Sequence, residues 1–447
     1  MANLSKSATT NPSLPEVHES IAVPHHWTFW RKMLAFSGPA YLVSVGYMDP
    51  GNWATDIEGG ARFGYRLLWV LLLSNLMAVL LQTLSARLGI VTRRDLAQAC
   101  RDYYPKSVAF ALWGLCEIAI AACDLAEVLG GAIGVNLLTG MPLIWAVCLM
   151  ALDCFIILLL QNRGMRLVEI VIVVLVASIG FCYVVEVFLA RPEWIPLLHG
   201  LITPKLTGQS KLGGPTDLYV AMGIIGATVM PHNLYLHSAL VQTRRVERTP
   251  VGVRTANKFN LIDSVVALNL AFLVNAAILV MAAATFYRHG TVVTELKQAY
   301  QTLSPLVGYG LASTLFAVAL IFSGQSSTLT GTLAGQIVME GFLHIRLRPW
   351  LRRLITRAVA IVPAIIVIAV QGEQGSYKLL ILSQVILSIQ LPFAVVPLVQ
   401  FTCSRKRMGE FVNPLWVKVL AWTVAALIIG LNVWLLTVTV KGWVSGT

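Results

Sequence analysis

The sequence predicts an all-α polytopic membrane protein made of two inverted five-helix repeats and one further helix. Of its 447 residues, 57% are hydrophobic and only 12% are charged, a balance typical of chains that cross a bilayer several times. Runs of about 20 apolar residues, the length that spans a membrane, recur along the whole chain. Two of these runs are interrupted at corresponding places by a proline in a polar stretch, as in transporters built from repeats.

The apolar runs mark eleven predicted spans. They cover residues 33–62 (broken), 66–91, 107–138, 142–160, 166–190, 217–243 (broken), 260–286, 308–342, 352–371, 377–402 and 414–438. Residues 1–30 have no apolar core, so we expect a cytoplasmic tail and not a cleaved signal peptide. The remaining expected units are a first repeat at 31–190, an external loop at 191–216, a second repeat at 217–402, and the eleventh helix with an external C-terminus at 403–447.

The basic residues decide the predicted orientation. The net charge is +12, and most of the 33 lysines and arginines fall on the side of the N-terminus when the spans alternate. This bias places the N-terminus in the cytoplasm and the C-terminus outside. It also favours topology and contact with the lipid bilayer over nucleic acid as the explanation of the charge.

The first broken span carries the sequence YMDPGNW at residues 47–53. Proline lacks a backbone N–H and glycine weakens a helix, so carbonyl groups near Gly46 should lose their usual partners. Asp49 lies beside this break. Because a carboxylate at membrane depth is costly and free carbonyl groups bind cations, the stretch predicts a cation site.

The second broken span carries GATVMPHN at residues 226–233, five helices later. Its proline and asparagine align with those of the first break. An odd number of helices per repeat makes the two repeats inverted, and we expect the site where the two breaks meet at the midplane of the membrane.

The expected site combines hard and soft ligands. Asp49 and Asn52 offer oxygens, Met230 a thioether, and the breaks the carbonyl groups of Gly46 and Ala227. Oxygen ligands alone would suit Mg²⁺, Ca²⁺ or Mn²⁺, whereas a thioether favours Mn²⁺, Fe²⁺ and softer ions such as Cd²⁺. The alternative is that Met230 only packs.

From about residue 30 to 440, the chain resembles the Nramp family of proton-coupled divalent metal transporters. The matching motifs are MDPGN at 48–52, DLAE at 124–127, MPHNLYLHS at 230–238, SQVIL at 383–387 and LPFA at 391–394. The resemblance implies a LeuT-type fold with helices 1 and 6 broken, an eleventh helix as in bacterial members, and a bacterial plasma membrane. It also implies a metal-binding set of Asp49, Asn52, Met230 and the Gly46 and Ala227 carbonyl groups, with Gln384 joining in some conformations. Gly46 departs from the family, which more often has alanine there.

Proton coupling requires titratable groups that lead away from the metal. Asp49 can serve as both metal ligand and proton acceptor. Asp124 and Glu127 are three residues apart and share a helix face, and His232 follows the second proline. By resemblance, Asp124 and Glu127 form the proton path, with Arg353 as charge partner. The alternatives are static pairing of these acids with arginines and a histidine that only bonds freed backbone.

The expected function is proton-coupled import of Mn²⁺ or Fe²⁺, with Cd²⁺ and similar ions also carried, by alternating access. The sequence contains neither a nucleotide-binding loop nor a set of nucleophile and base that would indicate an enzyme, and no cofactor or obligate protein partner is expected. The alternatives are a Mg²⁺ transporter of the same family, a LeuT-type symporter of an organic substrate, and a channel or receptor whose breaks are hinges.

Overall fold

The computed structural model describes residues 12–15, 17–23, 27–152, 165–208, 216–291, 293, 296–307, 310–343, 349–371 and 373–445. The described chain is mainly helical. Its first half contains α1 (Phe29–Phe36), α2 (Pro39–Gly46), α3 (Pro50–Phe63), the 3-10 turn η1 (Gly64–Leu67), α4 (Leu68–Thr92), α5 (Leu96–Tyr103), α6 (Lys106–Thr139), α7 (Leu143–Ala151), α9 (Met165–Ala190) and α10 (Trp194–Ile202).

The second half contains α11 (Asp217–Thr228), α12 (Pro231–Leu240), the 3-10 turn η2 (Val241–Thr243), α13 (Pro250–Ala282), the π turn η3 (Ala283–Tyr287), α14 (Leu296–Val307), α15 (Leu311–Leu343), α16 (Pro349–Gln371), α17 (Glu373–Thr402), α18 (Arg405–Met408), η4 (Gly409–Phe411) and α19 (Leu415–Ser445). Two short parallel strands, β1 (Ile21–Ala22) and β2 (Arg244–Arg245), pair with each other.

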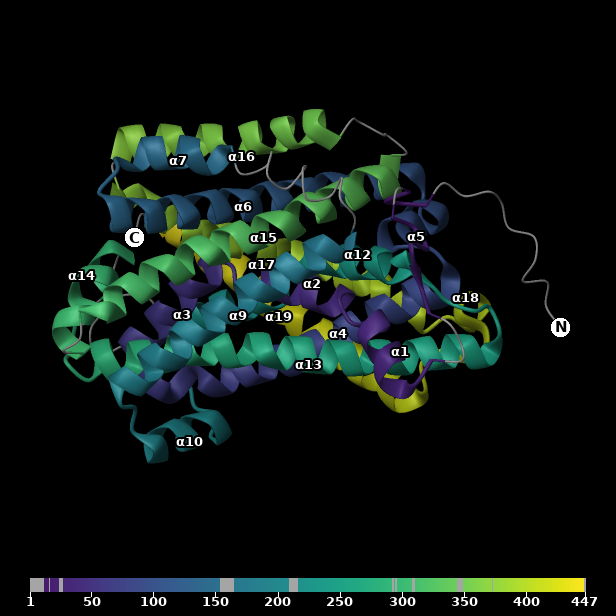
Figure 1. Ribbon diagram of the computed structural model, residues 1–447, viewed down its shortest axis with the longest axis horizontal. Coiled ribbons are helices and arrows are strands. Elements are labelled where there is room, and N and C mark those ends of the chain that lie inside the picture. Colours follow the sequence, from purple (N-terminus) through teal and green to yellow (C-terminus); the bar gives the residue numbers. More distant parts are fainter. Residues whose placement is uncertain are drawn as a thin grey trace.

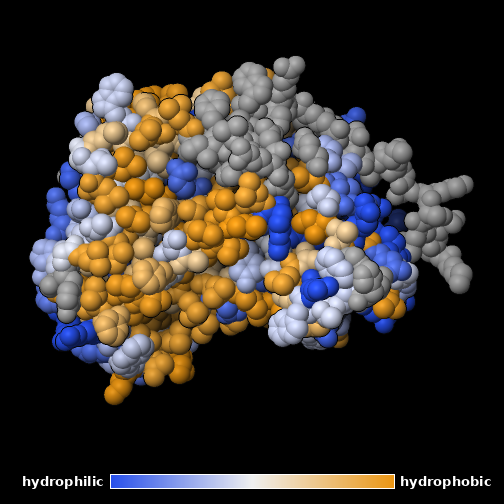
Figure 2. Space-filling view, in the orientation of Figure 1, coloured by the Kyte–Doolittle hydropathy of each residue, from blue (hydrophilic) through white to orange (hydrophobic). Residues whose placement is uncertain are grey.

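The long helices run along the longest axis of the molecule, with α1, α5 and α18 at one end and α10 and α14 at the other (Figure 1). Seven helices in the described residues are long and apolar enough to cross a membrane. The surface agrees, because orange apolar residues cover the middle of the face in Figure 2 and blue residues gather toward its two ends. The prediction of an all-α polytopic membrane protein is confirmed.

The predicted spans fall on helices wherever the structure describes them, and both predicted breaks are present. The first lies between α2 and α3 and the second between α11 and α12, and Pro50 and Pro231 are each the first residue of the following helix. Proline is favoured there because its fixed φ suits a helix start and its missing N–H is not needed.

Two details differ from the sequence prediction. The first span is also interrupted at Gly38, whose φ of 139° is open to glycine but not to other residues, so α1 is a separate helix before α2. The segment 191–216, predicted as a loop, contains α10. Part of the predicted span at 142–160 lies outside the described residues.

The four half-helices lie in the interior of the bundle. Helix α3 packs against α11, α13 and α17, while α12 packs against α2, α4 and α15. All fourteen residues of α3 and all ten of α12 are buried. The two breaks therefore meet inside the protein.

Candidate functional site

Asp49 lies between α2 and α3 as the N-cap of α3, and its side chain is fully buried. One carboxylate oxygen accepts a hydrogen bond of 2.7 Å from the backbone N–H of Asn52. The other oxygen, Oδ2, has no hydrogen-bond partner among the described residues. Because a buried carboxylate oxygen is costly to leave unpaired, Asp49 presents an open acceptor to a cation.

Side chains donate hydrogen bonds to backbone carbonyl groups at the first break. Asn275 of α13 donates to the Tyr47 carbonyl at 2.6 Å, and Trp53 donates to the Met48 carbonyl at 3.1 Å. The Gly46 carbonyl receives a longer bond of 3.3 Å from the backbone N–H of Asp49, so it is not fully free as the sequence predicted. A carbonyl oxygen has two lone pairs, which leaves one for a ligand.

Asn52 is oriented by the same break. Its amide nitrogen donates to the Tyr47 carbonyl, which turns the amide oxygen Oδ1 away from the backbone. That oxygen is buried and has no partner among the described residues. Asn52 therefore adds a second open oxygen, one helical turn beyond Asp49.

The second break supplies the softer donor. Met230 is the N-cap of α12 and has an exposed fraction of 0%. Across the described backbone, no N–H outside a regular helix donates to the Ala227 carbonyl, because Pro231 stands where the helical donor would be. Asn233 ties the two breaks together, since its amide donates to the Val43 carbonyl of α2 at 3.3 Å.

Gln384 of α17 reaches the start of α3. Its side chain is fully buried beside the Asp49 carboxylate, and its amide oxygen has no partner in the described part of the chain. A methyl group on Gly51 would lie 1.7 Å from the Gln384 amide nitrogen, so only glycine admits this approach. The structure thus brings Gln384 up to Asp49 at the first break, and it buries Ala227 and Met230 at the second break, which Asn233 joins to α2.

The predicted proton residues on α6 face the same neighbouring helix. A methyl group at Gly331 of α15 would lie 3.1 Å from the Glu127 carboxylate and 3.4 Å from that of Asp124. Both acids are buried, and Asp124 Oδ1 and Glu127 Oε2 have no partner among the described residues. Asp124 and Glu127 therefore share a face, as their spacing predicts.

Cys123 links this acidic pair to the second break. Its sulfur lies 3.5 Å from Glu127 Oε1 and 3.8 Å from His232 Nε2. The sequence alone does not indicate this link, because a cysteine four residues before a glutamate carries no recognisable motif. Only the packing of α12 against α6 places His232 beside it.

The arginine near the acidic pair is Arg357 of α16. It is buried and lies within electrostatic range of the Glu127 carboxylate. The side chain of Arg353, expected as the charge partner, lies outside the described residues, so that prediction stays open.

Gln82 of α4, which the sequence did not single out, connects the first break with α12. Gln82 of α4 donates to the Tyr47 hydroxyl at 2.9 Å, and its amide oxygen lies 3.1 Å from Nδ1 of His237. All three side chains are buried. His237 of α12 is thus connected through Gln82 to Tyr47 at the first break.

Comparison with known proteins identifies the family. The family model "Natural resistance-associated macrophage protein-like" matches residues 40–438. The chain belongs to the Nramp family. It is 59% identical over 433 residues to a divalent metal cation transporter, MntH, of Nostoc sp., with 97% of each chain covered. It is 57% identical to the MntH of Bradyrhizobium diazoefficiens, with 97% of this chain and 96% of that protein covered.

Solved structures support the same conclusion. A mutant of the manganese transporter of Eremococcus coleocola is 41% identical, covers 97% of this chain and 92% of its own, and superposes with a TM-score of 0.91. The nucleobase-cation symporter Mhp1 is 15% identical with a TM-score of 0.61, and so is similar in fold alone. The predicted Nramp membership, the LeuT-type fold class and the assignment as a transporter and not an enzyme are confirmed.

The close approach of Gln384 gives a first prediction for this Nramp protein. Gly51→Ala should push the Gln384 amide away from Asp49 and raise the KM for metal uptake about tenfold, which corresponds to about 1.4 kcal/mol of binding free energy. Gly59→Ala on the same helix is the matched control, because its methyl group would lie 3.4 Å from Ile224, an ordinary contact. Equal KM values for the two variants in proteoliposomes would contradict the role of Gln384.

Proposed function

We propose that the chain imports Mn²⁺ and Fe²⁺, and softer ions such as Cd²⁺, across the bacterial plasma membrane by alternating access coupled to protons. The names of its relatives, divalent metal cation transporters and a manganese transporter, support metal as the substrate. The transported ions are cargo, and no resident cofactor is part of the proposal.

One observation carries the proposal: three buried acceptor groups stand open where the two breaks meet. They are Asp49 Oδ2, Asn52 Oδ1 and the Ala227 carbonyl, and the second break also carries the buried Met230 thioether. One anionic oxygen, two neutral oxygens and a sulfur match the preference of Mn²⁺ and Fe²⁺. Mg²⁺ would gain little from sulfur, which disfavours the magnesium alternative.

The other groups have proposed roles around this centre. The Gly46 carbonyl and Gln384 complete the metal ligands in some conformations. Asp49 takes up a proton when the metal leaves, and His232, Glu127 and Asp124 carry it away, with Arg353 or Arg357 balancing the charge. The contacts of Cys123 with both His232 and Glu127 support a continuous polar route between the breaks and α6.

The domain boundaries and orientation are part of the same proposal. The tail at 1–30 lies in the cytoplasm, the repeats are 31–190 and 217–402, and the eleventh helix at 403–447 ends outside. α19 begins beside α18, at the end of the bundle that holds α1, and is 31 residues long. Such a helix extends about 46 Å, enough to cross a bilayer, which supports termini on opposite sides.

The decisive experiment measures metal uptake and internal pH together in purified proteoliposomes. We expect saturable Mn²⁺ uptake with inward proton flow, competition by Fe²⁺ and Cd²⁺, and little competition by Mg²⁺. Glu127→Gln should keep Mn²⁺ uptake within about threefold but reduce the accompanying proton flow at least about tenfold, because the amide cannot accept the transferred proton.

The matched control is Glu117→Gln on the same helix, ten residues earlier, whose carboxylate accepts a bond from Trp113 at 3.1 Å. This variant should leave proton flow unchanged. Uptake of Mg²⁺ in preference to Mn²⁺ would identify the protein as the magnesium carrier, and proton flow unaffected by Glu127→Gln would remove this acid from the path.

A further inference from the structure

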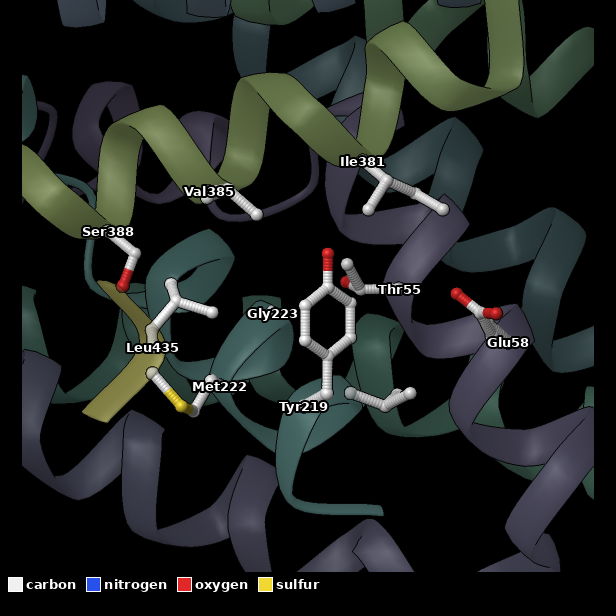
Figure 3. A pocket seen from close by; sticks show the side chains of 10 residues that line it. Thr55, Glu58, Tyr219, Met222, Gly223, Ile381, Val385, Ser388 and Leu435 are labelled. Carbon is white, nitrogen blue, oxygen red and sulfur yellow. The ribbon is translucent and has the colours of Figure 1, made fainter. Parts of the chain in front are cut away.

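A small pocket lies about one helical turn beyond the candidate metal site along α3 and α11, and Figure 3 shows the side chains that line it. Thr55 of α3 and Gly223 of α11 line it. Thr55 follows Asn52 by three residues and Gly223 precedes Ala227 by four, each about one turn of helix. The pocket therefore continues the metal site along the same two helices.

A row of polar residues on one face of α3 runs from the candidate metal site to the pocket. Asn52, Thr55, Glu58 and Arg62 follow one another at spacings of three, three and four residues, which puts them on one face of the helix. Glu58 is the one acidic residue among the described residues that line the pocket, and it is 7% exposed. Figure 3 shows its carboxylate at the edge of the pocket.

Arg62 neutralises this carboxylate. Its Nε lies 3.1 Å from Glu58 Oε1, and the two side chains are 8% and 10% exposed. Tyr219 of α11 and Tyr377 of α17 lie within electrostatic range of Glu58, and Figure 3 shows the ring of Tyr219 in the middle of the pocket. The pair is thus enclosed by the helices that form the metal site.

We propose that the incoming metal ion binds transiently to the Glu58 carboxylate before it reaches Asp49. Arg62 forms an ion pair with this carboxylate until the metal ion displaces the arginine. A divalent ion in a narrow, partly dehydrated passage needs an anionic oxygen, and Glu58 provides it one turn beyond Thr55. Because a transit site must also release its ion, a competing cation on the same helix keeps the affinity low.

This inference rests on the proposed function, since it assumes a divalent metal that enters from the side of the pocket. It adds a residue outside the ligand set at the breaks. The competing explanation is that Glu58 and Arg62 form an ordinary helix pair with spacing i, i+4, which stabilises the helix and has no part in transport.

The two explanations predict different kinetics. If the metal rests on Glu58, Glu58→Gln should raise the KM for Mn²⁺ about tenfold with little change in kcat, most strongly at low ionic strength. Arg62→Gln should act in the opposite direction and lower both KM and kcat severalfold, because the unopposed carboxylate holds the ion longer. Glu58→Asp, which keeps the charge, should recover most of the wild-type KM.

Uptake of Mn²⁺ into proteoliposomes, measured at two ionic strengths, tests these expectations. Glu193→Gln is the matched control, because Glu193 is an exposed acid whose backbone N–H bonds to Tyr65 close to the end of α3, and its loss should not alter KM. Unchanged KM in Glu58→Gln, or equal increases in Glu58→Gln and Glu58→Asp, would overturn the proposal. Wild-type protein without saturable Mn²⁺ uptake would instead refute the proposed function.

Discussion

Asp49→Asn is expected to abolish saturable metal uptake, with a loss of at least about a hundredfold in kcat/KM. Asparagine has the same size and can still cap α3 through the bond from Asn52, so the local structure should persist. What disappears is the only charge among the proposed ligands. Removing one partner of a buried charged contact costs about 2–5 kcal/mol, and about 2.7 kcal/mol already corresponds to a hundredfold change.

A second buried aspartate provides the control for this experiment. Asp95 caps α5 in the same way, accepting a bond of 2.8 Å from the backbone N–H of Gln98. Asp95→Asn removes a buried charge outside the candidate metal site and should leave metal uptake unchanged. Wild-type uptake by Asp49→Asn, with thermal stability equal to that of Asp95→Asn, would exclude Asp49 as the central ligand.

Met230→Ala is expected to keep some Mn²⁺ uptake and to lose discrimination against hard ions. Without the thioether, the site retains only oxygen ligands, which suit Mg²⁺ and Ca²⁺ as well as Mn²⁺. We expect the concentration of Ca²⁺ that halves Mn²⁺ uptake to fall about tenfold relative to wild type, a change of about 1.4 kcal/mol. Competition assays in proteoliposomes measure this ratio directly.

Truncation of a buried methionine also leaves a cavity, which costs about 2–5 kcal/mol of stability. Met408→Ala separates this effect from selectivity, because Met408 is 1% exposed but lies in α18, at the end of the bundle. This variant should lose stability and keep its ion preference. If Met230→Ala discriminates as wild type does, Met230 is a packing residue.

The main features of the fold could be predicted from the sequence because they depend on residues that are neighbours in the chain. Proline lacks the backbone N–H that a helix interior needs, and together with the polar residues beside them Pro50 and Pro231 predict both breaks. Proline alone is not sufficient, since Pro363 of α16 and Pro392 of α17 lie inside continuous helices. Charge density and the length of apolar runs in the same way predict the membrane class. The separate helix α1 was missed, since Gly38 resembles any glycine until its backbone conformation is known.

Only part of the candidate site could be predicted from the sequence. The chemistry of Asp49, Asn52 and Met230 is visible in the sequence, and the structure buries all three at the two breaks. Gln82, Asn275 and Arg357 were not singled out, because an amide or arginine in a membrane helix gives no sign of which residue it will face. Asn275 meets the Tyr47 carbonyl across 228 positions of the chain.

The sequence by itself determined where the backbone is broken, which donor atoms stand at each break, and which family the motifs resemble. Only the tertiary structure decided which acceptors stay open, that Cys123 stands between Glu127 and His232, and that Glu58 faces a pocket beyond the metal site. The physical reason is that helix breaks and donor chemistry depend on neighbours in the chain. Hydrogen-bond partners and pockets depend instead on how distant helices rotate and pack against one another.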